Sequence, residues 1–187
     1  MLRGHAGLYH VALHLPDGPE FARVLARLAA LGAAQAPTDH IFSMATYLTD
    51  PDGIGLELTL ETPGRFAGFE IGPRSIVVRD SDGRRRGPTE PLDLAPVLGW
   101  LDDRPLTDPV APGAFVGHVH LHVPDLAAGV AFQRDVIGFE EHMVMTAIGM
   151  ADLSAGGRFP HRIAMNVWNG PDAVQPPPGT AGMRRLT

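Results

Sequence analysis

The chain has 187 residues, of which 44% are hydrophobic, a formal net charge of −6 and no cysteine. This length suits one domain or two small modules that share a core, and the composition excludes disulfides, thiolate nucleophiles and cysteine-based zinc sites. The basic run at residues 84–86 is flanked by acidic residues and is interpreted as a solvated loop. No stretch reaches the ~18 apolar residues of a membrane helix. We therefore expect a soluble, cytoplasmic protein with no nucleic-acid or membrane partner.

One short sequence occurs twice. HVALHLPD begins at His10 and HVHLHVPD begins at His118, 108 residues later, and six of their eight positions are identical. In both copies aliphatic residues alternate with polar ones, which predicts a strand with one aliphatic face and one face that carries imidazoles. Such a repeat indicates two related modules.

A helix is expected after each copy. In GPEFARVLARLAALG the apolar residues Phe21, Val24, Leu25, Leu28 and Leu31 fall at helical spacing before a glycine. In DLAAGVAFQRDVIG a looser apolar face is formed by Leu126, Val130, Phe132, Val136 and Ile137. Asp125 is the expected N-cap of this second helix, and Gly138 is its expected end.

Strands follow each helix. SMATYLTDPDGIGLELTL contains two β-rich runs that flank an Asp-Pro-Asp-Gly turn, and AAQAPTDH before it gives a weaker strand. The second copy supplies three candidate strands in FEEHMVMTAIGMADLSAGGRFPHRIAMNVW. The predicted unit is strand–helix–strand–strand–strand, written twice.

The chain thus divides into a first module at residues 1–62, a connector at 63–114, a second module at 115–169 and a tail at 170–187. The connector is rich in Pro and Gly, with one strand expected at SIVVR and a short helix around LDLAPVLGWLDD. Because a connector of this length is unusual in a compact domain, it suggests that the modules exchange sheets or chains.

Three stretches, GHVHLHVPDL…FQRDVIGFE, LSAGG…HRIAMNVWN and YLTDPDGIGLEL, together resemble the vicinal oxygen chelate superfamily. This superfamily includes glyoxalases, bleomycin-resistance proteins and extradiol catechol dioxygenases, and the likeness is greatest to the catechol 2,3-dioxygenase-like branch. The resemblance implies an α+β fold in which two βαβββ modules pair into an open, mixed-sheet metal-binding barrel.

The resemblance also implies that His10, Glu57 and His118 are metal ligands. The pattern around Glu57 is consistent with this role. Glu57 alternates with Leu56, Leu58 and Leu60, so its carboxylate faces away from the three leucines and is either solvated or bound. Two imidazoles and one carboxylate are typical of non-haem Fe(II) oxygenases. We expect Fe(II), with Mn(II) or another divalent metal as the alternative. The second copy has Asn166 near the place that matches Glu57 and has no carboxylate there, which favours the dioxygenase over the glyoxalase branch.

Two further residues fit this chemistry by resemblance. His161 is similar to the acid–base histidine of the family, and imidazole titrates near neutrality. Tyr47 is similar to the tyrosine that hydrogen-bonds a substrate hydroxyl. Without the resemblance, His161 is a turn residue beside a proline and Tyr47 an ordinary strand aromatic.

The remaining histidines are assigned no catalytic role. His14 and His122 stand at strand ends and are expected to be solvated, while His120 shares a face with His118 and could line the cavity. His40 is expected at the surface, and no matching pattern includes His5 or His142.

Dioxygenases of this branch usually have four modules, whereas this chain resembles two. The tail TAGMRRLT resembles the start of another module, with Arg185 in the place of His10, and arginine cannot ligate a metal. The modules could pair with each other, pair across a homodimer by swapping, or bind no metal. The expected function is Fe(II)-dependent extradiol cleavage of a small catecholic substrate by dioxygen. The alternative is non-catalytic binding or sequestration of a small molecule, as in bleomycin-resistance proteins.

Overall fold

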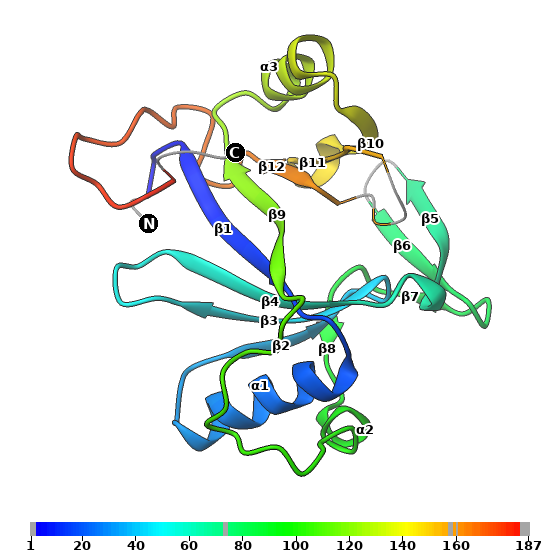
Figure 1. Ribbon diagram of the computed structural model, residues 1–187. Helices are drawn as coiled ribbons and strands as arrows, with labels where there is room; N and C mark the ends of the chain where they lie inside the picture. Colours follow the sequence, from blue (N-terminus) through cyan, green and yellow to red (C-terminus); the bar gives the residue numbers. More distant parts are fainter. Residues whose placement is uncertain (1–2, 73–74, 157–158, 160, 184–187) are drawn as a thin grey trace. The chain divides into compact units, whose positions relative to one another are not determined.

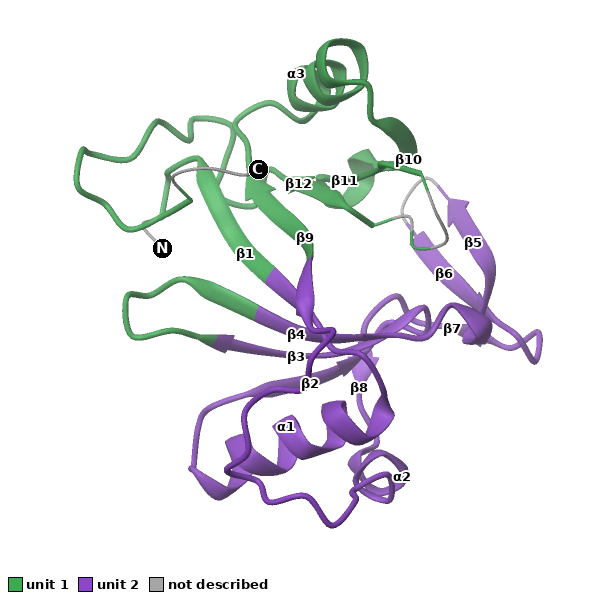
Figure 2. Ribbon diagram, viewed as in Figure 1, with its two compact units in different colours: residues 1–11, 49–56, 117–187 green, residues 12–48, 57–116 purple. Residues whose placement is uncertain are grey.

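The computed structural model describes residues 3–72, 75–156, 159 and 161–183. The chain forms two compact units, which are coloured separately in Figure 2. Unit 1 contains residues 1–11, 49–56 and 117–187, and unit 2 contains residues 12–48 and 57–116. The boundary falls within four strands: β1 (Gly7–His14), β3 (Ser43–Thr49), β4 (Gly55–Glu61) and β9 (Phe115–His122). Arg185 lies outside the described residues.

Unit 1 is a mixed sheet with one helical layer. Its part of the sheet has the order β10-β11-β12-β9-β1-β4. The added elements are α3 (Leu126–Ala131), η2 (Phe132–Ile137), β10 (Glu140–Met145), η3 (Thr146–Ile148), β11 (Met150–Ser154) and β12 (Ile163–Asn166). β11 pairs antiparallel with β10 and β12, whereas β12 pairs parallel with β9, so both pairing types occur in one sheet. The core of this unit includes Val119, Leu153 and Met165.

Unit 2 places a long helix against its part of the sheet, which has the order β1-β4-β3-β2-β8. Its further elements, labelled in Figure 1, are α1 (Gly18–Ala30), β2 (Ala36–Asp39), β8 (Glu90–Pro91) and α2 (Leu94–Leu98). Helix α1 buries Phe21, Val24 and Leu25 against Leu15, which follows β1, and Leu60 of β4. The predicted apolar face extends too far at its end, because Leu31 follows the last helical turn and is 73% exposed.

The connector contains more regular structure than its Pro- and Gly-rich composition indicated. The predicted strand is β6 (Ser75–Asp80) and the predicted short helix is α2, but β5 (Phe66–Gly72) and β7 (Arg85–Arg86) extend β6 into a separate antiparallel sheet. A short 3-10 helix, η1 (Pro63–Arg65), precedes β5. The basic run thus lies partly in a strand, where Arg86 hydrogen-bonds Glu90.

The two helices after the repeated strands begin alike and end differently. Asp17 and Asp125 each accept a hydrogen bond from the backbone N–H three residues later, so Asp125 is the N-cap as predicted. The second helix changes to a π-helix at Phe132 and ends at Gly138, whose φ is +93°. Because a π-helix bonds residues i and i+5, it shifts the side-chain spacing. Val130 is therefore buried while the predicted partners Phe132, Val136 and Ile137 are exposed.

The predicted α+β class with an open mixed sheet is confirmed. The sheet ends at an edge strand in each unit, β10 in unit 1 and β8 in unit 2, and does not close on itself. Among the described residues, no helix has both the length and the apolar character to cross a membrane.

Candidate metal and acid–base site

The two repeated histidines meet in unit 1. His10 on β1 and His118 on β9 are 5% and 4% exposed, and their Nε2 atoms lie 3.4 Å apart. Two nitrogens that bind one ion through bonds of roughly 2.0–2.1 Å lie about 3.0–3.4 Å apart at angles from about 90° to 110°. The observed spacing therefore fits two imidazoles that ligate one divalent cation.

Glu57 lies on β4 as the first residue beyond the unit boundary. Its side chain is buried at 3% exposure, so the solvated reading of this carboxylate is wrong. The hydroxyl of Thr59 donates a 2.9 Å hydrogen bond to Glu57 Oε1. The predicted turn before β4 is held by Asp50, whose side chain accepts from the N–H groups of Asp52 and Ile54.

The start of β4 runs close to His10 within unit 1. A Cβ added at Gly55 would lie 3.1 Å from His10 Cβ and 2.4 Å from the carbonyl oxygen of Tyr9, so only glycine fits there. Residues two apart on a strand share a face. Gly55 and Glu57 therefore lie on the same face of β4.

His161 lies beside His118 in unit 1. Their ring centroids are 4.2 Å apart in an edge-to-face arrangement, and His161 is 8% exposed. His161 Nδ1 is 2.9 Å from Oδ1 of Asp152, which is 2% exposed. An imidazole at this position, held beside a carboxylate, has the chemistry of a proton donor or acceptor.

A second histidine network runs along β9. His122 Nδ1–H donates to Asn166 Oδ1 at 2.6 Å, and Asn166 Nδ2–H donates to His120 Nε2 at 2.9 Å. His122 is 6% exposed, so its predicted solvation is wrong. Burial lowers the pKa of His122 below its ordinary value, and the hydrogen bond with Asn166 offsets part of that shift. We expect His122 to be neutral near pH 7.

His14, the first-copy counterpart of His122, is also buried rather than solvated. It is fully enclosed in unit 2, where its Nδ1 lies 2.7 Å from Oε1 of Glu61. No sequence pattern indicated these polar partners, because each one follows its strand's histidine by 44 to 47 residues. A strand end is exposed only if nothing packs over it, and here the neighbouring strand supplies a partner.

Tyr47 lies in unit 2 and pairs with another histidine. Its hydroxyl is 2.9 Å from His40 Nε2, and His40 Nδ1 is 2.9 Å from the carbonyl oxygen of Pro88. The surface assignment of His40 is therefore incomplete, because both ring nitrogens have partners. His142 is exposed, and His5 is only partly buried.

Sequence reasoning missed Tyr9 and Asp152. The Tyr9 ring centroid lies between 4.8 and 5.0 Å from those of His10, His120 and His122. No pattern marked this tyrosine, which belongs to neither the aliphatic nor the imidazole set of the repeat. The sequence feature that could have marked Asp152 is an acidic residue within the largely apolar strand MADLS.

The backbone shows which residues of the two copies correspond. Leu15 N–H donates to Thr59 O at 2.8 Å in unit 2, and Val123 N–H donates to Asn166 O at 2.8 Å in unit 1. Because Leu15 and Val123 occupy the same repeat position, Asn166 matches Thr59 rather than Glu57. The residue that matches Glu57 is Ala164, which is fully buried. The position that matches Glu57 therefore has no carboxylate, as expected, but Asn166 lies two residues beyond it.

No family model matches the sequence. The chain is 38% identical, over 187 residues, to a protein of Bacillus subtilis (strain 168) named catechol-2,3-dioxygenase, with 99% of this chain and 61% of that protein covered. A solved structure from the same species, assigned as a dioxygenase, matches with a TM-score of 0.50 at 13% identity over 89% of this chain and 42% of that chain. A halotolerant catechol dioxygenase, BphC, matches at 14% identity with a TM-score of 0.28, over 90% of this chain and 65% of that chain. That last score is too low to support an argument.

Proposed function

We propose that this chain acts in extradiol cleavage of a catecholic ring, with non-haem Fe(II) as cofactor. The proposal is supported by the resemblance of its sequence and of its fold to the vicinal oxygen chelate superfamily. The chain spans 61% of the length of its named relative, so the activity of the whole relative is a proposal for this chain. The observation that carries the proposal is the buried pair of repeated histidines, whose Nε2 atoms lie 3.4 Å apart.

Glu57 is the proposed third ligand. His10 and His118 in unit 1 and Glu57 in unit 2 are each buried. A buried carboxylate among apolar neighbours is costly unless a cation or hydrogen-bond donors compensate it. The hydroxyl of Thr59 donates a hydrogen bond to Glu57, and a divalent cation bound by the carboxylate would place a positive charge beside it.

The donor set fits a metal of the expected kind. Imidazole nitrogens suit iron, zinc and copper, and carboxylate oxygens suit harder cations such as manganese. A 2-His-1-carboxylate set that leaves open positions is typical of non-haem Fe(II) oxygenases. Fe(II) is therefore proposed, with Mn(II) or another divalent ion as the alternative. When bound, the metal would act as a Lewis acid toward the catechol oxygens.

The protein's own groups would handle the protons. His161 lies beside His118, where it could accept a proton from a catechol hydroxyl and return it as the ring opens. Tyr47 is proposed to hydrogen-bond a substrate hydroxyl. Its hydroxyl now pairs with His40, and because a phenol both donates and accepts, this bond leaves one capacity for a ligand.

The proposal is tested by loading the purified chain with Fe(II) under anaerobic conditions, counting bound iron, and then adding oxygen and simple catechols. The expected result is about one iron per chain and a coloured ring-opened product. His161→Ala should retain iron and slow ring cleavage by roughly 10²–10⁴-fold, the usual contribution of an acid–base group. Iron binding without ring-opened product in the parent would contradict the dioxygenase proposal.

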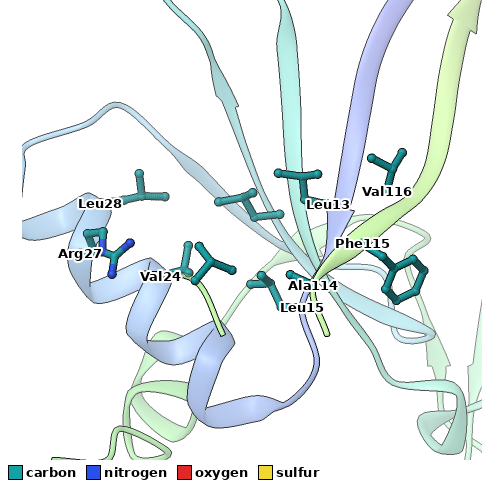
Figure 3. A pocket seen from close by; sticks show the side chains of 10 residues that line it. Leu13, Leu15, Val24, Arg27, Leu28, Ala114, Phe115 and Val116 are labelled. Carbon is teal, nitrogen blue, oxygen red and sulfur yellow. The ribbon is translucent and has the colours of Figure 1, made fainter. Parts of the chain in front are cut away.

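The alternative function, non-catalytic binding of a small molecule, is favoured by an apolar pocket in unit 2. It has a volume of about 420 Å³. Figure 3 shows its lining, with Leu13 from β1, Leu15 just after that strand, and Val24 and Leu28 from α1. Pockets of roughly 300–1,000 Å³ hold drug-sized ligands.

This alternative predicts that the metal-free chain binds aromatic ligands. Leu28→Trp should fill the pocket and weaken binding, whereas Leu31→Trp, on the 73% exposed side chain, should not. Fluorescence titration of the metal-free protein with an aromatic probe measures both. Equal binding by parent and Leu28→Trp would exclude this pocket.

A homodimer, with module swapping as one way to form it, remains a prediction. An unpaired sheet edge and an exposed apolar face favour self-association. In unit 1, Phe132, Val136 and Ile137 are all more than half exposed. Light scattering at micromolar concentration should give the mass of two chains, and a monomer with both units folded would contradict swapping.

A further inference from the structure

Asp152 is an acid in the interior of a sheet. It lies on β11, where its Cα is paired with Met143 of β10 on one side and with Ala164 of β12 on the other. The residue is 2% exposed and its strand neighbours Ala151 and Leu153 are fully buried. Burial of an ionised carboxylate costs several kcal/mol unless donors or cations compensate it. A buried acid at this position therefore needs a specific partner.

His161 is that partner. Its Nδ1 lies 2.9 Å from Asp152 Oδ1, although the orientation departs from the alignment of a full hydrogen bond. The exposed His142 of β10 also interacts electrostatically with Asp152 and with His161. Of the two histidines His161 is the buried one, and its ring centroid lies 4.2 Å from that of His118.

From this geometry we infer that Asp152 is a positioning residue that holds His161 in one ring orientation and in the tautomer with the proton on Nδ1. A carboxylate accepts hydrogen bonds and does not donate them, so the nitrogen that faces it carries the proton. Nε2 then keeps its lone pair as the basic nitrogen of the ring. A carboxylate that fixes the tautomer of a reactive histidine acts through that histidine and does not itself transfer the proton.

The inference deepens the proposed function but is testable without it. Metal-free protein labelled with ¹⁵N-histidine reports which ring nitrogen is protonated, and the His161 signals are assigned by their loss in His161→Gln. We expect Nδ1–H in the parent at a pH where the ring is neutral. Predominant Nε2–H in the parent would overturn the inference without any need for an Asp152 variant.

Asp152→Asn keeps the side-chain shape and adds an N–H donor that can face Nδ1. The His161 population should then shift toward Nε2–H. Asp80→Asn is the matched control, since it alters another buried aspartate, on β6 of unit 2; it should leave the His161 tautomer unchanged. An unchanged tautomer in a folded Asp152→Asn variant would also overturn the inference.

Activity gives a separate readout. If the ring-cleavage proposal holds, Asp152→Asn should lower kcat by roughly 10–100-fold, the usual effect of a lost partner behind a functional histidine, while KM changes little. If the parent shows Nδ1–H and no ring cleavage, the dioxygenase proposal fails and the role of Asp152 stands. If the parent is active and Asp152→Asn retains full kcat, Asp152 does not position His161 for the reaction.

Discussion

The two copies of the repeated strand share a backbone frame and differ in the chemistry that surrounds it. At matching positions the first copy has Glu57 and Thr59, whereas the second has Ala164 and Asn166. The strand-end histidines differ in the same way, since His14 pairs with the carboxylate of Glu61 and His122 with the amide of Asn166.

This difference shows that a duplicated backbone can carry different side chains at matching positions of its two copies. Each copy has a histidine, His10 or His118, at the same strand position, but the position that holds Glu57 in the first copy holds Ala164 in the second. The second copy instead uses neutral groups around His120 and His122. The proposed ligand set of two imidazoles and one carboxylate depends on this asymmetry, whereas a symmetric repeat would offer two of each.

The largest effects should come from the cores, where the two regions are expected to behave alike. Phe21 of unit 2 and Leu153 of unit 1 are both fully buried. Phe21→Ala should lower the free energy of unfolding by about 3–5 kcal/mol and Leu153→Ala by about 2–5 kcal/mol, because each leaves a cavity. Urea denaturation followed by circular dichroism measures both. A loss below about 1 kcal/mol in either variant would show that its core is poorly packed.

The second prediction compares two carboxylates on one strand. Glu57→Gln should weaken divalent-metal binding by about 100-fold or more, since the variant keeps the shape of the ligand and removes its charge. Glu61→Gln, whose side chain pairs with His14, should change metal affinity by less than about 3-fold. Titration calorimetry with Mn(II) gives both constants and avoids iron oxidation. Equal effects of the two substitutions would mean that Glu57 is not a ligand.

The strands, helix starts and hairpin of the two copies could be predicted from the sequence. The polar residues that pair with His14 and His122 could not. Alternation in HVALHLPD and HVHLHVPD, the capping Asp125 and the Asp-Pro-Asp-Gly turn are local signals, and each corresponds to an observed strand, helix start or hairpin. The burial of His14 and His122 depends on residues more than 40 positions away. No local pattern encodes such pairs.

The strands β5 and β7 of the connector were not predicted from the sequence, for a different reason. These strands contain glycine, arginine and single apolar residues, so neither has a period that stands out from loop sequence. They form because β6, which is rich in β-branched residues, provides a strand on which both can pair. A weak strand beside a strong one is a property of the pair, and single-segment patterns miss it.

The third prediction concerns the residues that match across the copies. Asn166 is fully buried and hydrogen-bonds His120, His122 and the backbone N–H of Trp168, so Asn166→Ala removes the bonds made to one acceptor and two donors and should cost about 1–3 kcal/mol for each group. Thr59→Ala removes one hydrogen bond, to Glu57, and should cost about 1 kcal/mol. Thermal and urea unfolding of the two variants rank them. If Thr59→Ala lowered the free energy of unfolding more than Asn166→Ala, the hydrogen bonds of Asn166 would not be the stronger of the two polar networks.

The smallest predicted effect is the pH dependence that His122 gives to the second copy. Burial lowers its pKa in the folded state, so between that value and the ordinary value near 6.5 the unfolded chain binds more protons than the folded one. Stability from this residue is therefore fully present above about pH 6.5 and is lost as the pH falls, by less than about 1.4 kcal/mol for each pH unit. His122→Gln removes the titrating ring, so the difference in unfolding free energy between parent and variant should change between pH 7.5 and roughly 5.5 and stay constant above that range. Urea denaturation at a series of pH values measures this difference, and a constant difference throughout would mean that His122 is not held neutral by its surroundings.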